Sequence, residues 1–445
     1  MSPEFDGFDI RAVADVVVSL LSEFEETSNS MRVLLRSAES DSLLKGNARG
    51  YIESRSLGVV RFLNTIDYVI MKALGKRDVS ELSVRDRSLL RLATYEGRWS
   101  NISSGTIRST ILDDSAHLAK TAIRAVELDL ESYLRNLGSR KALSLRLSHP
   151  TFLVDALLEN LPQNDAINLM CHNNGARDYF LRVNRFLEGH ETVIQELEEK
   201  GIKVESESGI PNLFRLYSEA QKLFGQPEFA NGQVLVQDKG SVAVAYALDP
   251  KPGTRVWDAC AAPGMKTQLL WELMGREGVL HATDISSARL ERARKRATRL
   301  GYDEVRFSQA DAVEAPIEGA DSILIDAPCT STGMLRSHPS YKWRLNKKTL
   351  FSLMSIQNKI LDGVLAAYVD SPGTEIVYAT CSLLPHEGES QIDSAMTRHN
   401  IELLEIPLEG SEGYAGFECS DKVLRLFPDK HNSNGFFIAK LRITG

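Results

Sequence analysis

The spacing of hydrophobic residues changes along the chain and divides it into three parts. In the first part, apolar residues recur at every third or fourth position, as residues 13–21 illustrate, and this spacing is typical of helices that bury one face. Ser83 stands where a helix cap is expected ahead of another such run. The pattern breaks around residues 147–150, which end in a proline. We therefore predict an all-α N-terminal domain over residues 1–148.

The second part of the chain mixes two hydrophobic patterns. Residues 179–184 and 203–205 have the composition of strands. Residues 191–200 form an acidic, amphipathic run that is typical of a helix. We predict a small α+β middle domain over residues 149–230.

After Gly232, short apolar segments alternate with longer amphipathic ones. This alternation is typical of a doubly wound, Rossmann-like parallel sheet covered by helices. We therefore predict an α/β domain over residues 231–445. Its strands are predicted at residues 256–259, 279–283, 305–309, 322–325 and 375–379.

Composition supports several domains in one globular protein. The chain has 445 residues, of which 43% are hydrophobic, so its length is sufficient for two or three separate cores. No apolar run is long enough to span a bilayer, and the first residues are acidic, so we expect a cytoplasmic protein with no membrane partner. The cysteines are odd in number and lack metal-ligand spacing, which predicts reduced thiols and no metal. They are Cys171, Cys260, Cys329, Cys381 and Cys419.

The net charge of −8 conceals one basic stretch. No acidic residue lies between Asp326 and Asp362, whereas Tyr341 and Trp343 stand among basic residues there. Such a stretch is a candidate RNA-facing surface that contacts phosphates, and an ordinary solvated loop and helix is an equally good interpretation. Its basic residues are Arg336, Lys342, Arg344, Lys347, Lys348 and Lys359.

Polar residues stand at the ends of the predicted strands. Ligands of open α/β sheets bind beyond the carboxyl ends of the strands, so these residues belong to one candidate site. The first strand, ending at Asp258, leads into a loop of small residues that lets a ligand approach the backbone. The acid that ends the second strand, Asp284, suits a ribose diol. The loop comprises Cys260, Ala261, Ala262, Pro263, Gly264, Met265 and Lys266, and later strands are followed by Asp311, Asp326 and Cys381.

The loop lacks both the dinucleotide glycine fingerprint and the P-loop pattern. NAD and ATP are therefore disfavoured, and a nucleoside cofactor without phosphates fits better. A single strand-end Asp is more often a helix cap than a ribose ligand. Cys260, between alanines, is interpreted as a small packing residue whose backbone is available for binding. Three acids at successive strand ends nevertheless favour a ligand site.

Three motifs in this order resemble the Sun/Fmu family of RNA cytosine-C5 methyltransferases. They are Asp-Ala-Cys-Ala-Ala-Pro-Gly-Met-Lys-Thr at residues 258–267, Asp-Ala-Pro-Cys at 326–329 and Thr-Cys-Ser at 380–382. The N-terminal helices resemble the NusB-type RNA-binding domain of the bacterial ribosomal RNA member. Further matches to the family are residues 147–150, 181–184, 236–238, 425–428 and 435–437, with Pro385, Glu387 and Glu389.

The resemblance implies that a methyl group passes from S-adenosylmethionine to carbon 5 of a cytosine in RNA. Carbon 5 is a poor nucleophile until a thiolate adds to carbon 6, and the resemblance assigns that thiolate to Cys381. It implies that Asp326 binds the ring and amino edge of the base, and that Cys329 helps to remove the carbon 5 proton. For the cofactor it implies backbone groups of residues 260–266, with Asp284 on the ribose, Asp311 on the adenine, and Asp326 and Arg289 nearby.

Two cysteines leave the nucleophile ambiguous, because DNA cytosine methyltransferases use the cysteine of a Pro-Cys motif like Pro328-Cys329. The sequence Thr380-Cys381-Ser382 favours Cys381 and RNA. A buried structural thiol is the alternative for Cys381. We predict that cationic or dipolar neighbours lower its pKa.

A target base must leave its stack to reach such a site, which favours a single-stranded or loop cytosine. Analogy with the NusB-bearing member favours small-subunit rRNA, and tRNA is the nearest alternative. An alternative of another class is a non-catalytic RNA-binding ribosome assembly factor, which two thiols at strand ends disfavour.

Three residues depart from the family pattern. Met265 stands where a second glycine is usual, Gly388 where Asn is usual and Asn434 where Asp is common. If the backbone at position 265 required a positive torsion, Met would be strained there.

Overall fold

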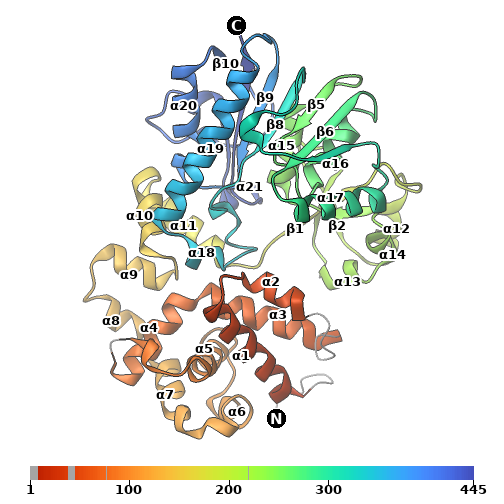
Figure 1. Cartoon of the computed structure of the whole chain (residues 1–445). Helices are drawn as coiled ribbons and strands as arrows, with labels where there is room; N and C mark the ends of the chain where they lie inside the picture. The colour runs from red at the N-terminus through yellow and green to blue at the C-terminus, as the bar shows by residue number, and fades with distance from the viewer. Residues whose placement is uncertain (1–8, 39–45, 77, 219, 445) are drawn as a thin grey trace. The chain divides into compact units, whose positions relative to one another are not determined.

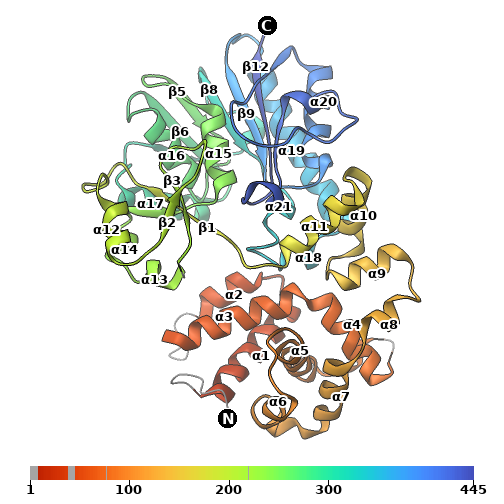
Figure 2. The same ribbon diagram turned by 180° about the vertical axis from the view of Figure 1, so that it is seen from behind.

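The computed structural model describes residues 9–38, 46–76, 78–218 and 220–444. The chain folds into two compact units. One unit extends to Gly175 and also includes Leu335–Leu345, and the other combines Ala176–Met334 with the chain from Asn346 onward. Both can be followed by colour in Figure 1 and, from behind, in Figure 2. The boundaries of the three predicted domains stay predictions.

The N-terminal unit is helical, as predicted. Ser83 caps α5, because its hydroxyl accepts a hydrogen bond from the Asp86 amide, and α1, α3, α4, α5 and α7 bury their apolar faces in one core. This unit contains α1 (Ile10–Glu26), α2 (Met31–Ser37), α3 (Gly46–Arg61), α4 (Leu63–Leu74), η3 (Val79–Glu81), α5 (Val84–Trp99), α6 (Ser104–Thr110), η4 (Asp113–Ser115), α7 (Ala116–Glu127), α8 (Leu130–Leu134), α9 (Ser139–Arg146), α10 (Thr151–Asn160), α11 (Gln163–Asn173) and α18 (Tyr341–Arg344).

A segment distant in sequence, Leu335–Leu345, completes the N-terminal unit. We call it the inserted segment. Its Trp343 packs against the helical core, and the indole N–H donates to the Val60 carbonyl at 2.6 Å. Arg344 donates to main-chain carbonyl groups at the end of α1 and just beyond it. The segment is therefore held by the helices through their main-chain oxygens.

Lys342 of the inserted segment lies in the interior of this unit. Its side chain is 0% exposed, and the ammonium donates to the Asn174 side-chain oxygen at 2.6 Å and to the Ser148 carbonyl at 3.0 Å. Burial lowers the pKa of Lys342 well below its usual value. Its assignment to an RNA-facing surface was therefore wrong, whereas Lys347, Lys348 and Lys359 are exposed.

A small antiparallel sheet with strand order β2-β3-β1-β4 begins the second unit. The predicted strands at residues 179–184 and 203–205 are present, and the other two strands were not predicted. Residues 151–173, which we predicted to belong to the middle domain, form α10 and α11 of the helical unit. The elements here are β1 (Tyr179–Val183), α12 (Val193–Glu199), β2 (Val204–Ser206), β3 (Leu213–Leu216), α13 (Ala220–Phe224), α14 (Pro227–Ala230) and β4 (Val234–Val236).

The larger sheet is Rossmann-like, as predicted, with the order β10-β12-β9-β8-β5-β6-β7 and β11 paired to β12. Five neighbouring strands, β9, β8, β5, β6 and β7, are parallel. At one side of them, β12 pairs antiparallel with β9, β10 and β11. The strands are β5 (Arg255–Asp258), β6 (Val279–Asp284), β7 (Arg306–Gln309), β8 (Ser322–Asp326), β9 (Glu375–Thr380), β10 (Ile401–Leu404), β11 (Leu424–Leu426) and β12 (Phe436–Ile443).

Helices cover both faces of this sheet because successive strand residues point to opposite sides. Val256 belongs to the core beneath α15, α16 and α17, and its neighbour Trp257 belongs to the core beneath α19 and α20. The helices are α15 (Lys239–Leu248), α16 (Met265–Leu273), α17 (Ser287–Leu300), η5 (Ala312–Glu314), η6 (Thr332–Met334), α19 (Lys347–Ala367), η7 (Pro385–Glu387), α20 (Glu389–Arg398), η8 (Ser420–Lys422) and α21 (Pro428–His431).

The strand order reverses between β5 and β8, since β6 and β7 extend the sheet on one side and β9 on the other. Ligands of such sheets bind at this switch point, beyond the carboxyl ends of the strands. Asp258 and Asp326 end the two central strands. Within the described residues, no helix is both long and apolar enough to cross a membrane.

Candidate functional site

The loop after β5 is fixed by main-chain contacts to β6. The Ala261 amide donates to the Thr283 carbonyl at 2.8 Å, and the Ala262 amide donates to the Asp284 carboxylate at 3.1 Å. Gly264 has a φ of +91°, which a glycine adopts without strain. Met265 is the first residue of α16, so the left-handed torsion falls on Gly264 and Met265 is not strained.

Asp284 and Arg289 hold this loop from both sides. The Asp284 carboxylate is 3% exposed and also accepts the Ser286 amide at 2.9 Å. The Arg289 guanidinium lies 3.4 Å from it and donates to the Ala262 carbonyl. The structure thus brings Asp284, Arg289 and the loop together at the end of β6.

Two further strand-end acids, Asp311 and Asp258, differ in their surroundings. Asp311 is exposed and caps η5, because its carboxylate accepts the Val313 amide at 3.0 Å. Asp258 is buried, and its Oδ2 accepts the Thr267 hydroxyl at 2.6 Å. Burial raises the pKa of Asp258 to about 7, although the Thr267 hydrogen bond opposes this. Its other oxygen has no hydrogen-bond partner within the described part of the chain.

The Lys266 side chain pairs with Asp326, a contact that sequence analysis did not predict. Its ammonium lies 2.7 Å from Asp326 Oδ2. Burial opposes the charge of Lys266, but Asp326 raises the pKa of Lys266 above its ordinary value. The family resemblance had implied a role only for backbone groups of the loop, so Lys266 brings a cation to the site as well.

The two motif cysteines face each other. Cys329 Sγ lies 3.2 Å from Cys381 Sγ, and Ser331 Oγ lies 3.4 Å from the latter. The hydrogen bond with Cys329 lowers the pKa of Cys381 despite burial, with Ser331 and the Lys266 charge acting in the same direction. That hydrogen bond, together with burial, raises the pKa of Cys329 well above its usual value. The pair therefore favours a thiolate at Cys381 that accepts a hydrogen bond from the neutral Cys329 thiol.

This asymmetry predicts different reactivities for the two thiols. At about pH 7 we expect Cys381 to react with iodoacetamide at least about tenfold faster than Cys329, because the thiolate is the reactive species. Replacing Cys329 with Ala removes the donor and is expected to raise the pKa of Cys381. Peptide mass spectrometry of samples alkylated at a series of pH values measures both effects, with the exposed Cys171 as the reference thiol. Equal rates for Cys329 and Cys381 would contradict the assignment.

Cys260 differs from these two cysteines. Burial, reinforced by the nearby Asp326 charge, raises the pKa of Cys260, so its side chain stays a neutral thiol. This supports its interpretation as a small packing residue. Among the residues that the structure describes, no group of three or more His, Cys, Asp or Glu is arranged to hold a metal ion.

Comparison with known proteins identifies the fold and its family. Residues 245–442 match the family described as 16S rRNA methyltransferase RsmB/F, residues 149–221 the ferredoxin-like domain of RsmF/B-like methyltransferases, and residues 11–103 the NusB family. The probable ribosomal RNA small subunit methyltransferase B of Synechocystis is 30% identical over 86% of this chain and 89% of its own length. The chain belongs to the RsmB/F methyltransferase family.

Two further proteins resemble this RsmB/F-family chain. The mouse 28S rRNA (cytosine-C(5))-methyltransferase is 30% identical over 68% of this chain and 40% of its own length. The crystal structure of a methyltransferase homolog protein from Pyrococcus horikoshii superimposes with a TM-score of 0.60. It is 30% identical and covers 69% of this chain and 99% of its own.

The structure gives physical reasons for one departure of this RsmB/F-family protein from the family pattern. A Cβ on Gly388 would lie 2.7 Å from the Phe437 ring and 2.9 Å from Arg425 Nη2, so the packing there requires a glycine. At Asn434, another position that departs from the family pattern, the main-chain amide donates a hydrogen bond to the Asp238 carboxylate at 3.0 Å.

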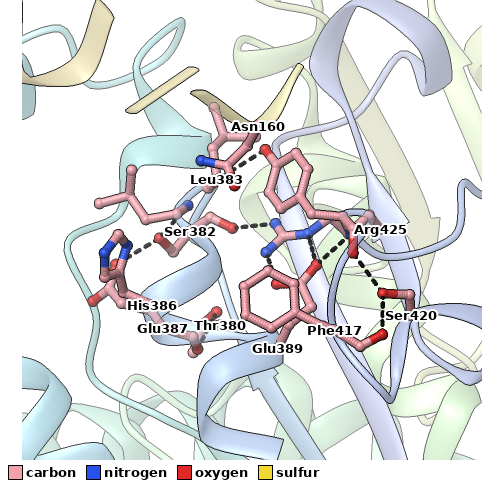
Figure 3. A network of polar contacts seen from close by, with 12 residues as sticks. Asn160, Thr380, Ser382, Leu383, His386, Glu387, Glu389, Phe417, Ser420 and Arg425 are labelled. Atoms are coloured by element: carbon pink, nitrogen blue, oxygen red, sulfur yellow. Dashed lines mark hydrogen bonds and ion pairs between the residues drawn. The ribbon is translucent and has the colours of Figure 1, made fainter. Parts of the chain in front are cut away.

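A buried ion pair behind Cys381 was also not predicted. Arg425 and Glu389 are both 0% exposed, and the guanidinium binds the carboxylate through two hydrogen bonds of 2.6 and 2.5 Å. Arg425 also donates to the carbonyl of Ser382 at 3.1 Å, as Figure 3 shows. The residue that follows Cys381 is therefore held by a charged pair. Both residues belong to the family motifs, but nothing in the sequence paired them.

Proposed function

We propose that this RsmB/F-family protein is an S-adenosylmethionine-dependent RNA cytosine-C5 methyltransferase that acts on small-subunit rRNA. The observation that carries the proposal is the pairing of Cys381 with Cys329, beside the Lys266–Asp326 ion pair. The related Synechocystis and mouse proteins, which are named as rRNA methyltransferases, support the substrate class.

Cys381 is proposed as the nucleophile. Its thiolate adds to carbon 6 of the cytosine, a sulfur–carbon bond forms, and the ring's electron pair moves to carbon 5, which becomes nucleophilic. Asp326, oriented by Lys266, is proposed to bind the ring-nitrogen and amino edge of the base.

Cys329 is proposed as the base that ends the reaction. While Cys381 is a free thiolate, the hydrogen bond between the two sulfurs raises the pKa of Cys329 and keeps it protonated. Once Cys381 is bonded to carbon 6, that anion no longer exists, and Cys329, which is partly exposed, releases its proton to water. Cys329 then removes the carbon 5 proton, the carbon 5–carbon 6 double bond re-forms and Cys381 leaves.

The residues around the loop after β5 fit a nucleoside cofactor. Small side chains leave the backbone accessible, and one oxygen of the buried Asp258 has no hydrogen-bond partner among the described residues. Bound S-adenosylmethionine would supply an electrophilic methyl group. We assign its binding to the backbone of residues 260–266, with Asp284 and Arg289 beside the loop, and with Asp311 and Asp326 as further contacts.

Bisulfite sequencing tests the proposal. We expect one cytosine of small-subunit rRNA to resist conversion in cells that contain the gene and to be converted in cells that lack it. Purified protein with radiolabelled S-adenosylmethionine should label that rRNA in preference to tRNA. Identical conversion of every rRNA and tRNA cytosine in both strains would overturn the activity. A difference confined to tRNA would overturn only the substrate.

A further inference from the structure

The buried Glu387 carboxylate links the chain segments that carry the two cysteines. Its side chain is 0% exposed. Oε1 accepts the Thr330 amide at 2.9 Å, and Oε2 accepts the Thr330 and Ser382 hydroxyls, each at 2.5 Å. Thr330 directly follows Cys329, and Ser382 directly follows Cys381. One carboxylate therefore bridges the residues next to both sulfurs.

The same residue is tied to the surrounding elements. The Gln357 side chain, on α19, donates to Glu387 Oε1 at 2.9 Å and to the Pro328 carbonyl at 2.8 Å. The main-chain carbonyl of Glu387 accepts the hydroxyls of Tyr378 and Thr380 at 3.0 and 3.3 Å. Glu387 thus has a fixed place between the end of β9, α19 and the loop that follows β8.

The Glu387 and Glu389 carboxylates, two residues apart, have different hydrogen-bond donors. Glu389 is neutralised by Arg425, whereas the four hydrogen bonds to the Glu387 oxygens come from amides and hydroxyls, which are uncharged. An uncompensated negative charge disfavours a second anion nearby. After the hydrogen bond to Cys381 and burial, the Glu387 charge further raises the pKa of Cys329.

We propose that Glu387 is a positioning residue that sets Cys329 against Cys381 and keeps the proton on Cys329 until the nucleophile has reacted. The inference rests on the proposed function, because it assigns Glu387 a part in the same two-cysteine reaction. Its charge adds to the preference for ionising Cys381 and not Cys329, and its hydrogen bonds fix the loop that carries Cys329.

Glu387→Gln tests the role, because it preserves the shape of the side chain and removes the charge. The new NH2 group can replace Oε2 and donate to the Thr330 and Ser382 hydroxyls, which accept as well as donate, but the reversed direction of these hydrogen bonds displaces the loop that carries Cys329. We expect kcat for methyl transfer to fall by about 100-fold, as a displaced catalytic group typically causes, with KM for S-adenosylmethionine unchanged. Without RNA, the alkylation of Cys329 is expected to begin at a lower pH than in the wild-type protein.

Thr330→Val is the matched comparison, because it removes one of the hydrogen bonds to Glu387, together with the 3.4 Å contact with Ser382 Oγ, and leaves the charge. It should reduce kcat less and leave the pH profile of Cys329 alkylation unchanged. If Glu387→Gln does not fold, Ser382→Ala and Thr330→Val carry the test through kcat, and wild-type values in both would overturn the proposal. A folded Glu387→Gln variant with an unchanged Cys329 profile would also overturn it, whatever its activity.

The alkylation measurement separates this inference from the proposed function. A shifted Cys329 profile in Glu387→Gln, in a protein that methylates neither rRNA nor tRNA, would support the effect of Glu387 on the thiols and contradict the RNA activity. Normal methylation by a variant with an unshifted profile would contradict the role of Glu387 alone.

Discussion

Replacing Cys381 with Ala is expected to reduce methyl transfer to RNA by about three orders of magnitude or more. Cys381 is the thiol whose pKa is lowered. Without a thiolate bonded to carbon 6, carbon 5 of the cytosine is not nucleophilic enough to accept a methyl group. The measurement is transfer of radiolabel from S-adenosylmethionine to small-subunit rRNA under single-turnover conditions.

Replacing Cys329 with Ala is the matched control, since it removes a sulfur that lies 3.2 Å from the first. This variant still has the nucleophile but lacks the proposed base, so the methylated adduct is expected to persist. A covalent protein–RNA complex should then appear on a denaturing gel with Cys329→Ala and not with Cys381→Ala. The opposite pattern would exchange the two roles, and no complex with either variant would contradict the covalent mechanism.

Replacing Glu389 with Ala is expected to lower the free energy of unfolding by about 3–5 kcal/mol, because it leaves a buried, unpaired arginine. Arg425 and Glu389 are fully buried. Burial opposes the charge of Arg425, but Glu389 raises its pKa. Arg425 nevertheless stays charged when its partner is removed, because a guanidinium is intrinsically too basic to lose its proton in a protein. Urea unfolding of the wild-type and variant proteins measures the difference.

An exposed ion pair provides the control for this prediction. Arg85 and Asp15 form a contact of 2.8 Å with both side chains more than half exposed, and such pairs contribute about 0–1 kcal/mol. Asp15→Ala is therefore expected to change stability little. An equal loss of unfolding free energy in both variants would contradict the view that burial makes the Arg425–Glu389 pair contribute more to stability than an exposed pair.

Much of the second unit could be predicted from the sequence. Strands of a parallel sheet are buried on both faces and are therefore continuous apolar runs, and the predicted ranges 256–259, 279–283 and 322–325 agree with β5, β6 and β8 to within one residue at each end. The strands β3 and β4 are only four and three residues long. Such short segments give little periodicity, although β2, also three residues long, was predicted after Gly201. The pairing of β3 and β4 with β1 depends on residues distant in sequence.

Sequence alone determined which chemical groups stand at the strand ends, because a parallel sheet brings the carboxyl ends of its strands to one edge whatever the detailed packing. Cys329, Cys381 and Asp326 follow from that rule and from their motifs. Tertiary structure alone decided which of these groups touch. The pairing of Lys266 with Asp326 and the bridge made by Glu387 require side chains from different elements to meet within hydrogen-bond distance.

The same distinction explains why one residue of the basic stretch between Asp326 and Asp362 is not on the surface. Its charges suggested a surface, yet Lys342 is buried because carbonyl and amide oxygens from α3 and from the end of α11 surround its ammonium. A lysine can leave water only where such acceptors replace its hydration. Those acceptors come from residues far away in the sequence, so long-range packing, and not local composition, decides whether a basic residue is available to RNA.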